Sequence, residues 1–521
     1  MISCGISYGQ TASQPAAPAT TSAPSAADFE FVPPTYDREG ILRPRQKYTD
    51  TITRGMEFIL KQQEPWAGDN TVLDEEGRTR PGYFFYSMGY DKQMNAVGQA
   101  GTNRGAAYPA FHHAIYIETF LDYYVYSGNP ESLQRARDLA DWNIAHSTPA
   151  DCLYPYIPYS TIYKGKPGGG PDGDAIVPSK GGIMGMAYLR LYRMTRDEKY
   201  LQAAERIAIT LQKTQRPKGN WYYRVNPVTG KVTDPYSSAM IYPVILFEAL
   251  DELTGKPRFA DAAQKALQWI LSGPAKTMNW NCFFEDVVIA ENPQNRINWD
   301  AIDTAIYFLK HSDRNKEYVK TAEKIAAWVE KNFVKPDEHY PTSEAVYEQF
   351  VCYRPMSGHT GHWALLLCEF YRVTGDDAYR KRVLNIASYI TYHLQKDNHF
   401  SVGPNWGKSC WYSLQFGPIL HLITIMGEFP QAMSRGESHL LRTTAAVQSI
   451  RYEPETITYT TDAASTDVLK LAFIPDEIRV NGKLIQEGDE GPNRYELNPL
   501  TLALRLHHEK GEVVVLRKMP E

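Results

Sequence analysis

The stretch LFEALDELTGKPRFADAAQKALQWI, residues 246–270, contains an apolar helix, a short polar turn and an amphipathic helix. The same pattern occurs in YLRLYRMTRDEKYLQAAERIAITL from Tyr188, IYFLKHSDRNKEYVKTAEKIAAWV from Ile306 and LCEFYRVTGDDAYRKRVLNIASYI from Leu367. The aromatic residue after each turn recurs every 59 to 61 residues, at Tyr200, Phe259, Tyr318 and Tyr379. A repeat of this kind is typical of helix pairs that pack side by side.

A looser copy, FLDYYVYSGNPESLQRARDLADWNI, begins at Phe120. These five hairpins leave one further helix at each end of the repeat region, over residues 48–62 and 411–426. Pairing of the two end helices closes the repeat into a ring, which we favour over an open solenoid. The predicted inner helices are apolar nearly all round and span 110–127, 180–194, 237–253, 300–311, 358–374 and 411–427. The predicted outer helices are amphipathic and span 45–62, 131–146, 197–213, 257–272, 315–333 and 377–395.

The sequence changes character near Ser434, where short strand-like runs bounded by turn residues begin, such as EIRVNGKLIQEG. The predicted fold class is therefore an all-α (α/α)6 toroid or barrel with a small C-terminal all-β domain. The expected divisions are an N-terminal tether over 1–35, the catalytic barrel over 36–432 and a β-sandwich-like domain over 433–521. Three roles fit the β domain, namely capping the barrel, supporting a homo-oligomer or binding sugar.

Composition limits the classes of partner. The net charge is −5 and basic residues form no tract, which argues against nucleic acid and anionic membrane surfaces. The 35 tyrosines and 10 tryptophans suit stacking on sugar rings, although they also suit the filling of a helical ring. The glycine-rich stretch GKPGGGPDGD, residues 165–174, lacks the ending of a phosphate-binding loop, and no cofactor is expected.

The N-terminus contains a pattern that is typical of a lipid-anchoring signal. Residues 2–5, Ile-Ser-Cys-Gly, resemble the end of a bacterial lipobox, and a Ser/Thr/Ala/Pro-rich stretch follows to Ala27. This pattern predicts a lipid anchor at Cys4 and a periplasmic or cell-surface location. A chance match to so short a pattern is the alternative.

The predicted connections differ in length. Turns from inner to outer helices are short, whereas connections from outer to inner helices are long. The long connections cover 63–109, 147–179, 214–236, 273–299, 334–357 and 396–410. All of them reach the end of the ring that holds the N-termini of the inner helices. Long structured loops usually carry function, and helix N-termini favour anionic groups such as a uronic acid carboxylate. We therefore expect the active site at this end.

Three aspartates precede or begin inner helices, as a carboxylate directed into the ring would. Asp300 is the first choice as a catalytic residue, with Asp174 or Asp234 as its acid/base partner, and Asp303 lies one turn further along the same helix. Glycoside hydrolysis needs a protonated carboxylic acid and a second carboxylate. Each aspartate could instead serve only as a helix N-cap.

Polar and aromatic residues near the same helix starts are candidate substrate-binding residues. They are His112, His113, Lys180, Tyr236, Arg296, Trp299, Tyr353, Arg354, His359, His362, Trp406 and Trp411. Cations among them could hold a carboxylate, and the tryptophans could stack on sugar rings. His359 and His362 are spaced like metal ligands but lack an obvious third ligand, so no metal is expected.

The helical pattern resembles the (α/α)6 uronic-acid enzymes. The stretch YSSAMIYPVILFEALDELTGKPRFADAA, residues 236–263, is similar in rhythm to the repeat of the glucuronyl C5-epimerases. The WxRG-type signature of an unsaturated glucuronyl hydrolase is not evident. The length, the C-terminal β domain and the lipoprotein-like start are more similar to the β-glucuronidases of glycoside hydrolase family 154. This resemblance implies an exo-acting hydrolase and carries over no catalytic residue.

The sequence therefore predicts a glycoside hydrolase that releases glucuronic acid from glycans. The runner-up is a polysaccharide lyase, with Tyr236 or Tyr353 and His113 or His359 removing the C5 proton while a cation neutralises the carboxylate. A third alternative is a non-catalytic glycan-binding lipoprotein.

Overall fold

The computed structural model describes residues 32–61, 106–163, 166–168, 173–282, 294–350, 352–403, 413–488 and 490–517, together with short strands between residues 72 and 98. Within these ranges, no helix is long and apolar enough to cross a membrane.

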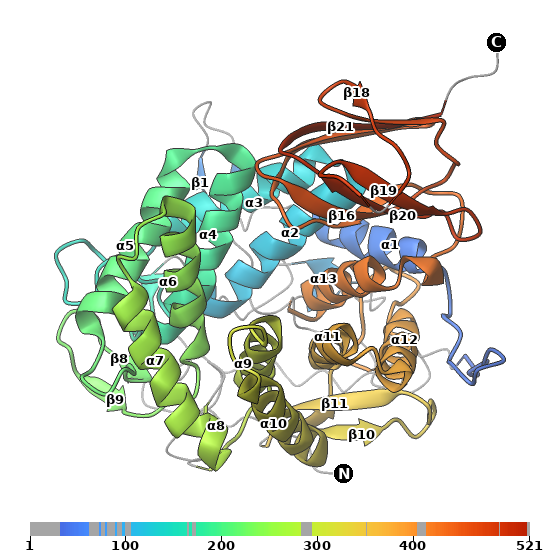
Figure 1. Cartoon of the computed structure of the whole chain (residues 1–521). Helices are drawn as coiled ribbons and strands as arrows, with labels where there is room; N and C mark the ends of the chain where they lie inside the picture. The colour runs from blue at the N-terminus through green and yellow to red at the C-terminus, as the bar shows by residue number, and fades with distance from the viewer. Residues whose placement is uncertain are drawn as a thin grey trace.

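Helix pairs form a ring (Figure 1). Within the described residues, six helices form the inner layer: α2 (Ala114–Ser127), α4 (Gly181–Thr195), α6 (Ile241–Thr254), α9 (Trp299–Lys310), α11 (Ser357–Thr374) and α13 (Ser413–Glu428). Their outer partners are α3 (Pro130–Ala145), α5 (Glu198–Thr214), α7 (Ala260–Ser272), α10 (Glu317–Phe333), α12 (Asp377–Thr391) and α1 (Tyr48–Lys61).

The two end helices pair as predicted, because α1 packs on α13 and α13 also packs on α2 and α11. The inner helices contact one another in order around the ring, and the contact between α6 and α9 is the most limited. The hairpin turns follow from local sequence. Gly255 and Gly375 adopt left-handed φ values of 65° and 67° and end α6 and α11. Asp376 then caps α12 by accepting a hydrogen bond from the Ala378 amide at 2.9 Å.

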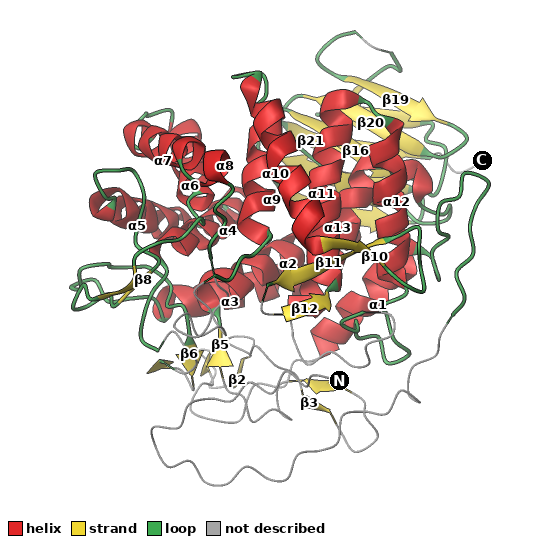
Figure 2. Ribbon diagram, turned by 90° about the horizontal axis from the view of Figure 1, so that it is seen from below, coloured by secondary structure: helices red, strands yellow, loops and turns green. Residues whose placement is uncertain are grey.

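Short elements fill the long connections. The helical ones are the π-helical turn η3 (Pro109–His113), the 3-10 turn η4 (Pro178–Lys180) and α8 (Pro274–Thr277). The strands are β1 (Val72–Leu73), β2 (Thr79–Arg80), β3 (Gly89–Tyr90), β4 (Ala96–Gly98), β5 (Ala106–Ala107), β6 (Ile162–Tyr163), β7 (Lys166–Pro167), β8 (Arg224–Val225), β9 (Val232–Asp234), β10 (Val334–Pro336), β11 (Glu344–Gln349) and β12 (Cys352–Pro355). Figure 2 shows many of these strands at one end of the helices and the C-terminal sheets at the other.

The C-terminal region forms two antiparallel sheets. The first has the order β13-β16-β20-β19 and the second the order β14-β15-β21-β17-β18. The strands are β13 (His439–Arg442), β14 (Val447–Glu453), β15 (Thr456–Thr461), β16 (Ser465–Lys470), β17 (Glu477–Val480), β18 (Lys483–Leu484), β19 (Arg494–Asn498), β20 (Ala503–His508) and β21 (Gly511–Leu516), and they follow the 3-10 turn η6 (Pro430–Ala432). Side chains alternate between buried and half-buried along β15, as expected for a sheet with one covered face.

The sheets pack against the C-terminal ends of α2 and α4. The Tyr452 hydroxyl donates to the Val125 carbonyl at 2.7 Å, and the Arg193 guanidinium makes two hydrogen bonds to Asp462 at 2.9 and 3.0 Å. One continuous hydrophobic core includes side chains of the ring and of both sheets. The C-terminal sheets thus cover one end of the ring and leave the inner-helix N-termini at the other.

Candidate functional site

Asp300 is the second residue of α9 and is almost completely buried, with 1% of its surface exposed. The Tyr242 hydroxyl lies 2.9 Å from its Oδ1 atom, and the Ser238 hydroxyl donates to Oδ2 at 3.3 Å. Tyr242 is the second residue of α6, and Ser238 lies in the connection just before that helix.

Burial raises the pKa of the Asp300 carboxyl, because water no longer stabilises its charged form. The positive charge of Lys180 acts in the opposite direction, and the negative charge of Asp303 adds to the increase. Lys180 is itself buried at the end of η4, with its ammonium 5.0 Å from the centre of the Phe111 ring. The result is a carboxyl that keeps its proton to higher pH than an exposed aspartate does.

A second carboxylate, Asp303, lies one turn along α9. The Tyr242 hydroxyl is 3.0 Å from its Oδ2 atom, and Nε2 of His362 is 3.0 Å from its Oδ1 atom. Because one hydroxyl contacts both aspartates, the contacted carboxyl oxygens lie no more than about 6 Å apart, a range that includes the spacing in retaining glycosidases.

An aromatic and histidine layer covers this pair. The Trp299 ring stacks on His362 with ring centres 4.0 Å apart, and it meets His359 edge-on at 5.1 Å. His421 of α13 approaches Trp299 at 6.3 Å and His362 at 5.8 Å. The layer joins α9, α11 and α13 at the centre of the ring.

Burial keeps two histidines of this layer, His359 and His421, neutral. It lowers the pKa of His359 to about 3, and it places the pKa of His421 well below its ordinary value. Nδ1 of His359 lies 2.9 Å from the amide oxygen of Asn298 and so acts as the donor, which leaves Nε2 as an acceptor in the neutral ring.

A cavity of about 940 Å³ reaches the carboxylate pair from within the ring. Tyr242 and Asp303 line it, together with the inner faces of α4 and α6 and residues of the C-terminal region such as Asp462 and Lys510. A volume of this size is typical of small-ligand sites. Asp303 therefore faces this cavity directly, and Tyr242, which also lines it, connects the cavity to Asp300.

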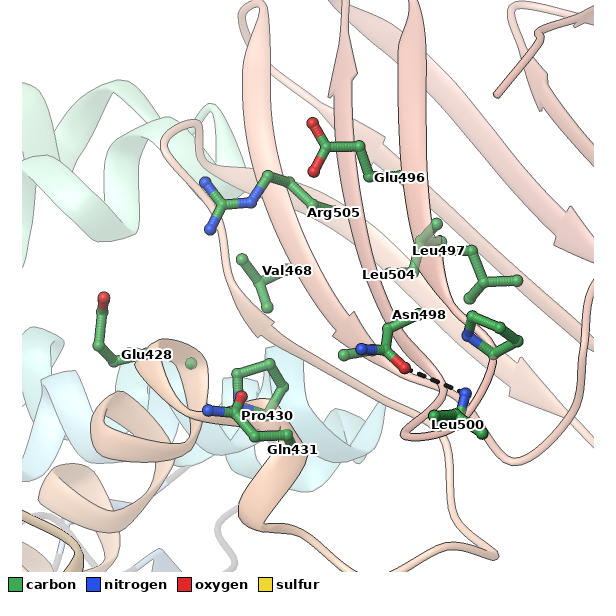
Figure 3. A pocket seen from close by; sticks show the side chains of 13 residues that line it. Glu428, Pro430, Gln431, Val468, Glu496, Leu497, Asn498, Leu500, Leu504 and Arg505 are labelled. Atoms are coloured by element: carbon green, nitrogen blue, oxygen red, sulfur yellow. Dashed lines mark hydrogen bonds between the residues drawn. The ribbon is translucent and has the colours of Figure 1, made fainter. Parts of the chain in front are cut away.

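A second pocket, of about 530 Å³, lies where the end of α13 meets strands β19 and β20 (Figure 3). Glu428, Gln431, Glu496 and Arg505 line it. It includes none of the predicted site residues.

The structure brings several of the sequence candidates together, namely Lys180, Trp299, Asp300, His359 and His362. His113 lies nearby in η3, but its Nδ1 atom pairs with the amide oxygen of Asn143 at 3.1 Å, and its ring packs on Trp142 of the outer helix α3. The His112 ring lies among Tyr108, Phe111 and Tyr116.

The structure brings Asp303, rather than Asp174 or Asp234, to Asp300. Asp174 is exposed and accepts a hydrogen bond from the Asn226 amide at 2.8 Å. Asp234 belongs to the β8–β9 hairpin, where Arg224 lies 3.7 Å from its carboxylate. Within the described residues, neither of these two carboxylates contacts Asp300.

Tyr236 and Arg296 lie in the long connections. The Tyr236 hydroxyl donates to the Asn279 carbonyl at 2.8 Å, and burial raises its pKa to about 12, which does not favour it as a base. The Arg296 guanidinium bonds to Asn281 and to the Gln294 carbonyl. The side chains of Tyr353 and Arg354, like residues Trp406 and Trp411, lie outside the described part of the chain.

Two members of the site were not among the sequence candidates. Tyr242 lies in an apolar helix, where a tyrosine resembles core filling, so no sequence signal marks it. His421 is the sole histidine within the described helix α13, whose only other titratable residue is the terminal Glu428, and a polar ring in so apolar a helix marks it. In the described ranges, no group of three or more His, Cys, Asp or Glu side chains could hold a metal ion.

No protein-family model matches this sequence, and no curated protein sequence matches it significantly. The fold is similar to that of cellobiose 2-epimerase from Spirochaeta thermophila DSM 6192, with a TM-score of 0.55 and 13% identity over 74% of this chain and 96% of that one. It is also similar to a D-mannose isomerase, with a TM-score of 0.52 and 13% identity over 73% and 96% of the two chains. A sugar epimerase from a ruminal bacterium gives a TM-score of 0.51 and 14% identity over 72% and 97%. At such identities, the similarity shows a shared helical fold.

Proposed function

We propose that this chain is a carbohydrate-active enzyme, a glycoside hydrolase in which Asp300 is the general acid and Asp303 the second carboxylate. The observation that carries the proposal is the pairing of a buried carboxyl of raised pKa with a cavity-facing carboxylate within about 6 Å. Glycoside hydrolysis needs one protonated and one ionised carboxyl group, and the two environments differ in that direction.

The substrate that we propose is a glycan ending in β-linked glucuronic acid, as in the exo-β-glucuronidases that the sequence resembles. The positive charge of Lys180 acts on Asp300, and the inner-helix N-termini add partial positive charge. Both features favour a substrate with a carboxylate. A lipid anchor at Cys4 and a periplasmic or cell-surface location belong to the same proposal.

A second candidate is proton transfer at a sugar carbon, by β-elimination, epimerisation or isomerisation. Buried neutral histidines, His359 and His421, favour it, because a neutral imidazole can accept a proton. The solved structures with similar folds include two epimerases and an isomerase. The low pKa of His359, about 3, makes it a weak base, and we therefore rank this chemistry second.

Product analysis separates these chemistries. The protein is incubated with 4-nitrophenyl β-D-glucuronide, with the matching glucoside, and with uronic-acid polysaccharides, while nitrophenolate and ultraviolet absorbance are followed. We expect nitrophenolate from the glucuronide and little from the glucoside. A rise in ultraviolet absorbance on polysaccharide, or deuterium uptake from D2O into a reducing sugar, would replace hydrolysis with proton transfer. Binding without any turnover would leave a glycan-binding protein.

A further inference from the structure

One hydroxyl group contacts two carboxyl groups at the centre of the ring. Oη of Tyr242 lies 2.9 Å from Oδ1 of Asp300 and 3.0 Å from Oδ2 of Asp303. Both distances are those of O–H···O hydrogen bonds. A tyrosine hydroxyl has a single hydrogen, so it can donate in only one of the two contacts.

The other contact needs a hydrogen of its own. If both aspartates were ionised, one of them would face the lone pairs of the hydroxyl oxygen at hydrogen-bond distance in a buried site. That arrangement is repulsive, and a buried anion without a donor is costly. A carboxylic acid hydrogen directed at Oη of Tyr242 removes the repulsion, because the phenol oxygen can accept while its own hydrogen is donated.

We infer that Tyr242 holds Asp300 and Asp303 as a singly protonated pair, in which Asp300 carries the acid hydrogen and Asp303 is ionised. The hydrogen bonds then run in one direction, from the Asp300 carboxylic acid to Oη of Tyr242 and from Oη to Asp303. The roles of acid and base assigned to this pair rest on the proposed function, but the protonation state does not.

The surroundings of the two carboxyls decide which one holds the hydrogen. Asp300 is 1% exposed, and burial raises its pKa despite the opposing charge of Lys180. Its other neighbours, the Ser238 hydroxyl at 3.3 Å and the Cys282 thiol, are uncharged, since burial also raises the pKa of that thiol. The Asp300 carboxyl is thus the more strongly desolvated member of the pair.

Asp303 is the more exposed carboxyl of the pair. Its side chain is 21% exposed and lines the central cavity, where water can reach it. Nε2 of His362 lies 3.0 Å from Oδ1 but outside hydrogen-bond geometry, and the Tyr242 hydroxyl contacts Oδ2. An acid beside a carboxylate is the starting state that both stereochemical routes of glycoside hydrolysis require.

Infrared spectroscopy of the resting protein tests this inference without any substrate. A protonated carboxylic acid has a C=O stretching band separate from the carboxylate bands. We expect this band near neutral pH in the wild type and in Asp303→Asn, and its loss in Asp300→Asn. Absence of any such band in the wild type, or its loss in Asp303→Asn but not in Asp300→Asn, would overturn the assignment.

A second variant tests the part played by Tyr242. In Tyr242→Phe the acid hydrogen loses its acceptor, so the band should move to higher frequency. Tyr307→Phe is the matched control. Tyr307 lies on α9, the helix that carries both aspartates, and its hydroxyl donates to Glu248 at 2.9 Å. An unmoved band in a folded Tyr242→Phe protein contradicts the inference. If that variant does not fold, the two aspartate variants still locate the hydrogen.

The same variants separate this inference from the proposed function. If glucuronide hydrolysis is found, Tyr242→Phe should lower kcat about ten- to hundredfold and affect KM less, because the main role of Tyr242 is to position the catalytic pair. If no hydrolysis is found but the band responds as expected, the protonation state stands and the proposed function fails.

Discussion

His508 and Asp467 form an ion pair that is completely buried between the C-terminal strands. Nε2 of His508 lies 2.7 Å from Oδ2 of Asp467, and Nδ1 lies 2.6 Å from the Glu509 carbonyl oxygen. Both neighbours accept hydrogen bonds, so both ring nitrogens carry hydrogen and the ring is charged. Burial lowers the pKa of His508, but the bond and charge of Asp467 outweigh it and leave the pKa above its ordinary value of 6.5.

This pair predicts a pH-dependent stability. When the pKa of a group is higher in the folded state than in the unfolded state, the group stabilises the fold fully below the unfolded pKa. This contribution is lost as the pH rises through the folded pKa. We expect the free energy of unfolding in urea to fall as the pH is raised above about 6.5, and His508→Gln to remove that fall. His146→Gln, on α3, is the control and should keep the wild-type slope. A His508→Gln protein with an unchanged slope would contradict the charged pair.

Lys180 predicts a shift in the pH–rate profile. Its charge lowers the pKa of Asp300, so Lys180→Met should raise that pKa and move the basic limb of kcat/KM to higher pH. Lys199→Met, which removes an exposed partner of Asp141, is the control. A basic limb that stays in place or moves to lower pH argues against Asp300 as the acid.

The sequence identified part of this site for a physical reason. Successive helix pairs bring the inner-helix N-termini together, so Lys180, Asp300 and His359 could be expected to meet. Asp234 precedes an inner helix in the same way, but the β8–β9 hairpin pairs it with Arg224 instead. Tyr242 escaped detection because its partners come from another helix, and only the packing of α6 beside α9 brings them together.

Close packing of α4 on α6 positions Tyr242. A Cβ atom on Gly182 would lie 2.5 Å from the carbonyl carbon of Tyr242, which is backbone and cannot rotate away. Gly182→Ala should therefore push the helices apart, lower the free energy of unfolding by about 1–3 kcal/mol and reduce turnover. The neighbouring Gly181→Ala is the control, since its Cβ would meet a flexible Ile157 side chain at 3.4 Å. Equal stability of the two variants, measured in urea, would refute this account of the packing.

The sequence predicts the presence of a helix more reliably than the residues at which the helix begins and ends. The fourth inner helix was expected over 300–311 and runs from Trp299 to Lys310, because apolar periodicity marks it clearly. The first inner helix was expected from residue 110, but residues 109–113 form a π-helical turn before α2 begins. The π-helical and α-helical bonding patterns share the same apolar residues, so periodicity cannot separate them.

The ring and the C-terminal sheets share one hydrophobic core, and this predicts how the whole molecule unfolds. The sequence change near Ser434 suggested a separate domain, whereas the packing of β13 and β14 on α2 becomes visible only in three dimensions. We expect a single cooperative transition in calorimetry at a pH of maximal stability. Two resolved transitions, with the smaller one abolished by Asp467→Ala, would show instead that the sheets unfold independently.

The role of Asp300 as the general acid at the ring centre can be tested in one assay. The rate of nitrophenolate release from 4-nitrophenyl β-D-glucuronide is compared between the wild type, Asp300→Asn and the exposed-site control Asp141→Asn. We predict that Asp300→Asn loses activity by a factor of about 10²–10⁴, as expected for removal of a general acid, while the control keeps the wild-type rate. A folded Asp300→Asn protein that hydrolyses the glucuronide at the wild-type rate would contradict the assignment of Asp300 as the acid.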